Sequence, residues 1–150
     1  MSDSFFSSTE FQKTEVLQST LWVNPERAVN EAKLSATLSL DVHDMGVSVS
    51  CDGLMTKRIE LTVSVNVRDD IGDDSSDRMR AQVVLAGGSR APKREGIEDA
   101  ALERYLGANS VSSLYATART YLEFITSMSP IQRFTLPAID PYKVIDSNEE

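Results

Sequence analysis

The sequence predicts a single α+β domain over residues 1–150, built as a four-stranded antiparallel sheet with one long helix and one short helix packed on one face. Two observations predict the sheet: apolar residues recur at every second position in several segments, and no helical segment separates those segments. A third observation predicts the covering layer, because apolar residues near the C-terminus follow helical spacing. We expect residues 1–8 and 145–150 to be flexible.

The first two strands are predicted in the N-terminal third of the chain. Phe11–Val23 is rich in β-branched and aromatic residues and stops at Asn24-Pro25. After a connection over residues 24–33, apolar residues alternate from Leu34 to Cys51, with an interruption at Gly46. A strand with a bulge or kink at this glycine fits that pattern.

The third and fourth strands form the second half of the predicted sheet. Asp52-Gly53 is a hairpin-type turn signal, and it leads to Ile59–Val67, where apolar and polar residues alternate without a break. One face of this strand is therefore predicted to be buried and the other solvated. An acidic loop is expected over Arg68–Asp77, and Met79–Gly88 is predicted to be the last strand, ending at its two glycines.

Helices are predicted only after the sheet. Glu98–Tyr105 is expected to form the short helix, and Asn109 or Ser110 is expected to cap the long one. The apolar stripe of the long helix must cover the sheet or a partner, and it comprises Val111, Leu114, Tyr115, Ala118, Leu122 and Ile125. Pro130 prevents continuation of the helix, and residues 131–142 are expected to be extended because they contain two further prolines.

Composition excludes several classes of function. The net charge of −8, from 15 Lys+Arg against 23 Asp+Glu, repels a phosphate backbone, so we expect no nucleic-acid partner. No apolar run approaches the roughly 18 residues of a membrane span, so we expect no membrane partner. The single cysteine excludes an internal disulfide framework, and no signal-peptide pattern stands at the N-terminus. Together these features favour a cytoplasmic location.

The sequence offers few parts for catalysis or metal binding. His43 has no second histidine or cysteine at ligand spacing, and Cys51 lies too far along the same strand to pair with it, so a buried, inert thiol is expected. The aspartates of the acidic loop miss the alternate-position pattern of a calcium loop. Gly87-Gly88 lacks the lysine and hydroxyl residue of a phosphate loop. We therefore predict no enzyme, no metal and no cofactor.

The C-terminal part of the chain resembles the SecB family of chaperones. The features that carry the resemblance are, in order, Leu106-Gly107-Ala108, Leu114-Tyr115, Ala118-Arg119, Leu122, and Phe134-Thr135-Leu136 with Pro137 and Ile139. The "FQ" strand at Phe11, the Gly87-Gly88 pair and Gly96-Ile97-Glu98 fall in the corresponding order. The resemblance runs from about Phe11 to Ile139, with gaps in the connection and the acidic loop.

This resemblance implies a homo-oligomer, a dimer of dimers, that holds unfolded polypeptide in apolar grooves without ATP hydrolysis. On that basis the residues expected to bind clients are Trp22, Tyr121, Phe124, Met128, Phe134 and Tyr142. For Trp22 and Phe134, burial in the core is an equal alternative, since large aromatic side chains are buried on average. The residues expected at the subunit interface are Leu114, Tyr115, Ala118, Arg119 and Leu122.

Two departures from the family pattern bear on the role. The residues after Ile139 include no cysteine or histidine, whereas members devoted to export usually add a helix and a metal-binding tail that contacts the translocation ATPase. The connection after the first strand is also short. The pattern therefore favours a chaperone that stabilises the antitoxin of a toxin–antitoxin–chaperone system over one that delivers preproteins for export. A non-chaperone oligomeric adaptor that binds one folded partner is the remaining alternative.

Overall fold

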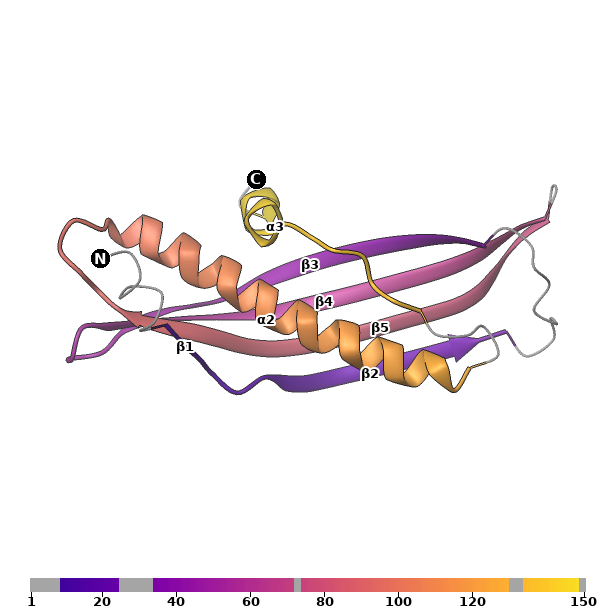
Figure 1. The fold of residues 1–150 in the computed structure, drawn as a ribbon, viewed down its shortest axis with the longest axis horizontal. Helices are drawn as coiled ribbons and strands as arrows, with labels where there is room; N and C mark the ends of the chain where they lie inside the picture. The colour runs from indigo at the N-terminus through magenta and orange to yellow at the C-terminus, as the bar shows by residue number, and fades with distance from the viewer. Residues whose placement is uncertain (1–8, 25–33, 72–73, 130–133, 149–150) are drawn as a thin grey trace.

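The computed structural model describes residues 9–24, 34–71, 74–129 and 134–148, which form one sheet and two helices (Figure 1). The strands are β1 (Glu10–Phe11), β2 (Glu15–Val23), β3 (Leu34–Val49), β4 (Leu54–Ile71) and β5 (Asp74–Pro92), and the helices are α2 (Asp99–Ser127) and α3 (Pro141–Asn148). All pairings are antiparallel, in the order β3-β4-β5, with β1 and β2 both paired to the other side of β5. The α+β fold class is thus confirmed.

The sheet has five strands because the predicted first strand is divided. Residues 12–14 separate β1 from β2, and both pieces pair with β5. The predicted interruption at Gly46 is present as a register shift between Asp44 and Gly46, where the glycine adopts a φ of 105° that other residues rarely tolerate. The turn after Asp52 is also confirmed, since it joins β3 to β4.

Two predicted interruptions of the sheet are wrong. The acidic segment is mostly strand, because the β4–β5 ladder continues through Arg68↔Asp77 to Ile71↔Asp74. Gly87 and Gly88 lie inside β5 and do not end it. A Cβ on Gly88 would lie 2.3 Å from the carbonyl oxygen of Lys57, so the glycine is required for close approach of the two strands and not for a turn.

Helix α2 is continuous, so the predicted division into a short helix and a separately capped long helix is wrong. Asn109 and Ser110 do not cap a new helix; their side chains donate hydrogen bonds back to the carbonyl oxygens of Tyr105 and Leu106, at 3.0 and 2.8 Å. This pattern satisfies polar side chains within a helix without interrupting it. Ser89 of β5 also donates to the carbonyl of Leu106, at 2.8 Å, which ties this part of α2 to the sheet.

The C-terminal segment forms a second helix where extended or flexible chain was expected. Residues 134–140 have no regular secondary structure, and α3 then begins at Pro141, a position that proline favours because the first helical N–H needs no partner. Ile145 is buried, which makes α3 part of the fold. Residues 145–148, which were expected to be flexible, belong to this helix, while residues 1–8 and 149–150 lie outside the described chain.

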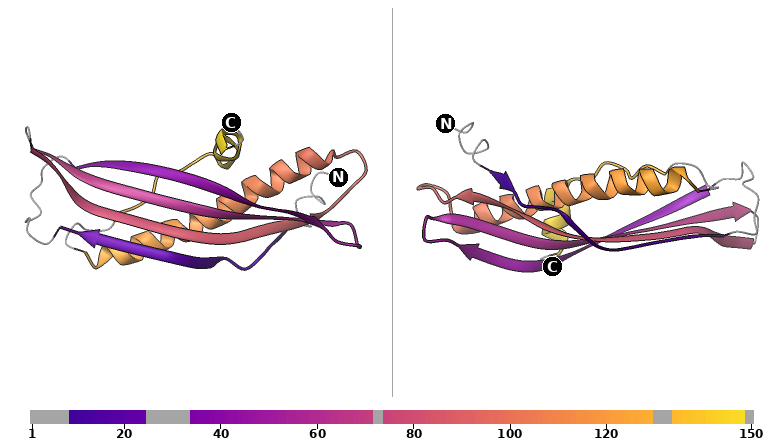
Figure 2. Two further views of the ribbon diagram at one scale, coloured as in Figure 1. Left: turned by 180° about the vertical axis from the view of Figure 1, so that it is seen from behind. Right: turned by 90° about the horizontal axis from the view of Figure 1, so that it is seen from below.

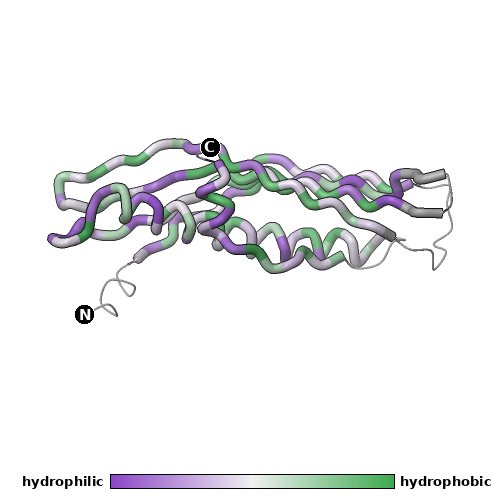
Figure 3. The backbone as a smooth tube through the Cα atoms, turned by 90° about the horizontal axis from the view of Figure 1, so that it is seen from above, coloured by the Kyte–Doolittle hydropathy of each residue, from purple (hydrophilic) through white to green (hydrophobic). Residues whose placement is uncertain are grey.

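The core lies between one face of the sheet and α2. The side view shows α2 along a single face, and the view from behind shows the other face without a helix (Figure 2). Hydrophobic and hydrophilic residues alternate along the strands, which is the basis of this arrangement (Figure 3). The largest fully buried side chains are Ile59, Leu61, Met79, Leu85, Leu102, Leu106, Leu114, Leu122, Leu136, Val63, Val83 and Val111.

Candidate polypeptide-binding site

The candidate site lies where the C-terminal half of α2 passes over β2 at the edge of the sheet. A hydrogen bond of 2.6 Å between the hydroxyl groups of Ser19 and Tyr121 joins the two elements. Thr126, buried near the end of α2, donates to the carbonyl of Leu122 and accepts a hydrogen bond from the backbone N–H of Phe134 at 2.8 Å. The first contact joins the helix to the edge strand, and the second joins the end of the helix to the segment that follows it.

A hollow of about 440 Å³ opens between these two elements. Its walls are mainly apolar, and they are formed by Ser19, Thr20, Leu21, Val23, Tyr121, Ile125, Met128 and Ser129. Tyr121 also lines a shallower, more open concavity on the outer side of α2, together with Phe124 and residues of the preceding turn. The two depressions therefore share the Tyr121 side chain and form one surface.

Large apolar side chains on this surface are open to solvent. Leu21 is 37% exposed, Phe124 is 64% exposed and Met128 is 71% exposed. Contiguous exposed apolar surface on a soluble protein typically marks a place where another molecule binds. Methionine adapts its shape to different partners because its side chain is unbranched and flexible.

Three of the six residues predicted to bind clients meet at this surface, namely Tyr121, Phe124 and Met128. Trp22 does not join them. It pairs with Arg80 next to the Leu21↔Ala81 pair, and Ala81 is a core residue, so alternation along the strand directs Trp22 to the opposite face of the sheet. There it is 41% exposed, with the Arg80 guanidinium 4.6 Å from its ring centroid.

Phe134 and Tyr142 lie elsewhere. Both are partly buried and pack against the main core. Tyr142 belongs to α3, and the guanidinium of Arg104 lies 4.6 Å from the centroid of its ring. Neither residue lines the hollow beside β2. Client binding by Phe134 and Tyr142 stays a prediction.

The residues predicted for a subunit interface are largely covered within one chain. Leu114, Tyr115, Ala118 and Leu122 are buried in the core against the sheet, so they have little surface to offer a partner. Only Arg119 is exposed, and its guanidinium lies 3.9 Å from the carboxylate of Glu123 one turn later. An interface on α2 would have to use other residues of its outer face.

Sequence reasoning missed Leu21 and placed Ile125 in the core stripe. The signal for Leu21 was available, because it belongs to a strand with large apolar residues at adjacent as well as alternate positions. Such a strand has apolar side chains on both faces. Ile125 follows the helical spacing of the core residues, and only the position of the helix end over the sheet edge brings it to the hollow.

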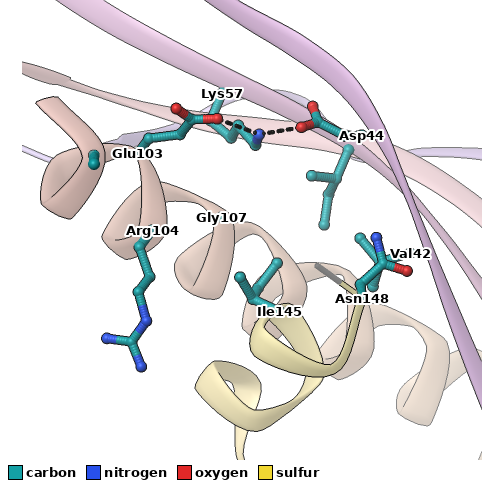
Figure 4. A pocket seen from close by; sticks show the side chains of 10 residues that line it. Val42, Asp44, Lys57, Glu103, Arg104, Gly107, Ile145 and Asn148 are labelled. Carbon is teal, nitrogen blue, oxygen red and sulfur yellow. Dashed lines mark hydrogen bonds and ion pairs between the residues drawn. The ribbon is translucent and has the colours of Figure 1, made fainter. Parts of the chain in front are cut away.

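A second cavity, of about 280 Å³, lies at the other end of the fold between β3, α2 and α3 (Figure 4). Lys57 is buried there, and its ammonium group donates to Asp44 at 2.6 Å and to Glu103 at 2.9 Å. The hydrogen bond from Lys57 lowers the pKa of Asp44 below its ordinary value of 3.8. Burial by itself would lower the pKa of Lys57, but the hydrogen bonds to both carboxylates outweigh burial and raise this pKa above 10.5.

This polar cluster joins one buried cation to two carboxylates, and the other candidates for chemistry are dispersed. Cys51 is exposed in the turn after β3, so the expectation of a buried thiol is wrong, because the strand ends at Val49. His43 lies within β3, opposite Glu60. Among the described residues no three acidic, histidine or cysteine side chains gather as metal ligands, and no helix is long and apolar enough to cross a membrane.

Comparison with known proteins shows what this fold is similar to. No family model and no curated protein matches the sequence. Among solved structures, the chain is similar to the Mycobacterium tuberculosis Rv1957 SecB-like chaperone in complex with a ChAD peptide from the Rv1956 HigA1 antitoxin. The TM-score is 0.57 at 17% identity, over 89% of this chain and 92% of the other. The chain therefore has a SecB-like fold.

A second solved structure has the same architecture. It is a protein of unknown function from Streptococcus agalactiae, with a TM-score of 0.50 and 11% identity, over 87% of this chain and 97% of that one. Both similarities extend over most of the chain.

Proposed function

We propose that this protein is an ATP-independent chaperone, a holdase, that binds non-native polypeptide at the apolar surface between β2 and the C-terminal half of α2. The observation that carries the proposal is the exposure of Leu21, Phe124 and Met128 on one surface, formed by two adjoining depressions, of a SecB-like fold. No catalytic reaction is part of the proposal.

The surface suits binding of loosely specified, unfolded segments. Burial of apolar area contributes about 25 cal/mol per Å² whatever the order of the side chains that are buried. A shallow surface without one dominant pocket discriminates little between partners, and a flexible methionine extends that tolerance. Binding to the non-native state then keeps that state from aggregating by mass action.

The particular role that we propose is to stabilise the antitoxin of a toxin–antitoxin system. Its support is the M. tuberculosis structure, in which a chaperone of similar fold holds an antitoxin peptide. The alternative within the same class is delivery of preproteins for export. Cytoplasmic location and assembly as a homo-oligomer, a dimer of dimers, belong to the same proposal.

Suppression of aggregation tests the holdase function. The chain is mixed with an unrelated, chemically denatured enzyme, and light scattering is followed after dilution of the denaturant. We expect the wild-type protein to suppress scattering and the Phe124→Ser/Met128→Ser variant to lose most of that effect. The matched control is Val47→Ser/Val49→Ser, which also removes exposed apolar side chains (38% and 50% exposed) but from the other edge of the sheet, and it should act like wild type.

An adaptor for one folded partner would leave scattering unchanged in all three proteins, and this result would overturn the holdase proposal. If both double variants lost suppression of scattering to the same extent, binding would not be specific to the surface between β2 and α2. Co-expression with a candidate antitoxin separates the two chaperone roles, since a dedicated chaperone should raise the amount of that antitoxin and leave a secreted preprotein unaffected.

A further inference from the structure

The methionines of the chain fall into two groups that differ in exposure. The sequence has five methionines, and four of them lie in the described residues. Met55 and Met79 are buried in the hydrophobic clusters between the sheet and α2. By contrast, Met45 is 47% exposed and Met128 is 71% exposed. Because an oxidant must reach the sulfur atom, only the exposed pair among these four is open to oxidation in the folded protein.

The two exposed methionines have different surroundings. Met128 is the C-cap residue of α2, and it lines the hollow beside β2 together with Tyr121 and Ile125 of the same helix. Met45 lies in β3, at the opposite side of the sheet, and lines neither of the two depressions that form the candidate site. Oxidation of Met128 therefore alters the candidate site, and oxidation of Met45 does not.

Oxidation changes a methionine side chain at its sulfur atom. A peroxide transfers one oxygen atom to the thioether: an S=O bond forms, the O–O bond of the peroxide breaks, and water or an alcohol leaves. The sulfur is oxidised by two electrons and the peroxide is reduced by two. The product is polar and chiral, whereas the thioether is apolar and adapts to varied partners. At Met128 this change falls on a side chain that is more exposed than Leu21 and Phe124 of the same surface.

The hollow also has hydroxyl groups that suit a sulfoxide oxygen, which accepts hydrogen bonds. Ser19, Thr20, Tyr121 and Ser129 belong to its walls. The hydroxyl groups of Ser19 and Tyr121 share one hydrogen bond of 2.6 Å, so one of their two hydroxyl hydrogens is left for another acceptor. A sulfoxide oxygen at Met128 would therefore find hydrogen-bond donors on the walls of the same hollow.

We propose that Met128 is an oxidation-sensitive switch in the candidate site: a peroxide converts it to methionine sulfoxide, and this conversion weakens the binding of non-native polypeptide. The proposal rests on the proposed function and adds the regulation of that same surface. Methionine sulfoxide is reduced by enzymes, one for each sulfoxide epimer, so the switch is reversible. The fold is kept in both states because the core methionines, Met55 and Met79, are buried and stay reduced.

Treatment of the full chain with hydrogen peroxide tests the switch. All proteins carry Cys51→Ser, because the exposed thiol of Cys51 also reacts with peroxide. Oxidation of each methionine is followed by mass spectrometry of proteolytic peptides. Binding is measured by the fluorescence anisotropy of a labelled polypeptide that is kept unfolded by carbamidomethylation of its cysteines. The peroxide is removed before this measurement, so that the probe itself is not oxidised.

We expect the two exposed methionines to be oxidised at least about tenfold faster than the two buried ones. Oxidation should weaken binding about tenfold, because burial of one methionine side chain contributes roughly that factor. Reduction by both types of sulfoxide reductase should restore the affinity. Met128→Leu keeps an apolar side chain of similar size without the sulfur, so its affinity should change by less than about twofold on treatment. Met45→Leu is the matched control and should lose binding as the parent does.

The other outcomes separate the switch from the function on which it rests. If Met128 stays reduced while Met45 is oxidised, the assembled protein covers Met128 and the switch is overturned. Unchanged affinity after complete oxidation of Met128, or equal loss of binding in Met128→Leu, would also overturn it. Oxidation of all four methionines at one rate would show that peroxide unfolds the chain, which contradicts a local switch. Failure of the untreated parent to bind the probe would contradict the proposed function itself, and the switch with it.

Discussion

The two halves of helix α2 have different surroundings although one continuous helix contains both. The N-terminal half lies between the sheet and α3: Leu102 and Leu106 are buried, and Ile145 packs against Gly107. The C-terminal half has no second helix packed on it among the described residues, and Phe124 there is 64% exposed. The difference shows that α3 completes one end of the fold, while apolar side chains at the other end are left exposed.

The largest contrast is expected between core and surface residues of the same helix. Leu114→Ala should lower the free energy of unfolding by about 3 kcal/mol, because it leaves a cavity between α2 and the sheet. Phe124→Ala should change it by less than about 0.5 kcal/mol, because that side chain is mostly solvated. Urea denaturation measures both. A loss of 2 kcal/mol or more at Phe124, roughly the cost of a core truncation, would show that this position is covered in the assembled protein.

The polar cluster at the N-terminal half should show the next largest effect. Asp44→Asn combined with Glu103→Gln leaves the buried ammonium group of Lys57 without a carboxylate and should cost about 2 kcal/mol, less than a fully enclosed pair because both carboxylates are partly exposed. Lys57→Met removes the buried charge itself and should cost less than about 1 kcal/mol. The reverse order of the two costs, measured by urea denaturation, would contradict a stabilising role for the two carboxylates.

The same cluster predicts the pH dependence of stability. The pKa of Asp44 is lowered in the folded state, so its contribution is present above pH 3.8 and is lost as the pH falls through the lowered value. The pKa of Lys57 is raised, so its contribution is present below pH 10.5 and is lost as the pH rises through the raised value. Thermal melts across this range should show a plateau between the two limits, and Lys57→Met should reduce the loss at both ends.

The smallest effect is expected at the contact between α3 and α2. Arg104 forms a bidentate ion pair with Asp146, at 2.9 Å for both hydrogen bonds, and its guanidinium lies over the ring of Tyr142. Arg104→Gln should increase hydrogen exchange in residues 141–148 while the midpoint of global unfolding stays within error. Unchanged exchange in α3 would mean that the burial of Ile145 is sufficient to hold this helix.

The parts of the fold that could be predicted are those with an uninterrupted local pattern. Alternation from Ile59 to Val67 identified the central strand and its buried face, and the stripe from Val111 to Leu122 identified the face of the helix that meets the sheet. The wrong predictions concern residues whose role depends on a distant partner. The sequence predicts a strand end at Gly88, but the glycine lies inside β5, where the backbone of Lys57 in the neighbouring strand approaches it closely.

The candidate site also combines residues that a local pattern could predict with residues whose position depends on a distant part of the chain. Tyr121, Phe124 and Met128, which the family resemblance predicts to bind clients, lie close together in sequence on one helix and share one surface. Trp22 was assigned to the same surface because sequence alone does not relate the face of an edge strand to a helix about a hundred residues later. Leu21, its neighbour, lines the hollow in its place.

By itself, therefore, the sequence determined the class of fold, the buried faces of its strands and long helix, and the supply of apolar residues in excess of what the core needs. Side-chain periodicity is a local property, and it specifies such faces without reference to the rest of the chain. Only the tertiary structure decided where the excess is exposed, because the register of β2 on β5 and the path of α2 across the sheet set which apolar side chains meet at the open edge and which are covered.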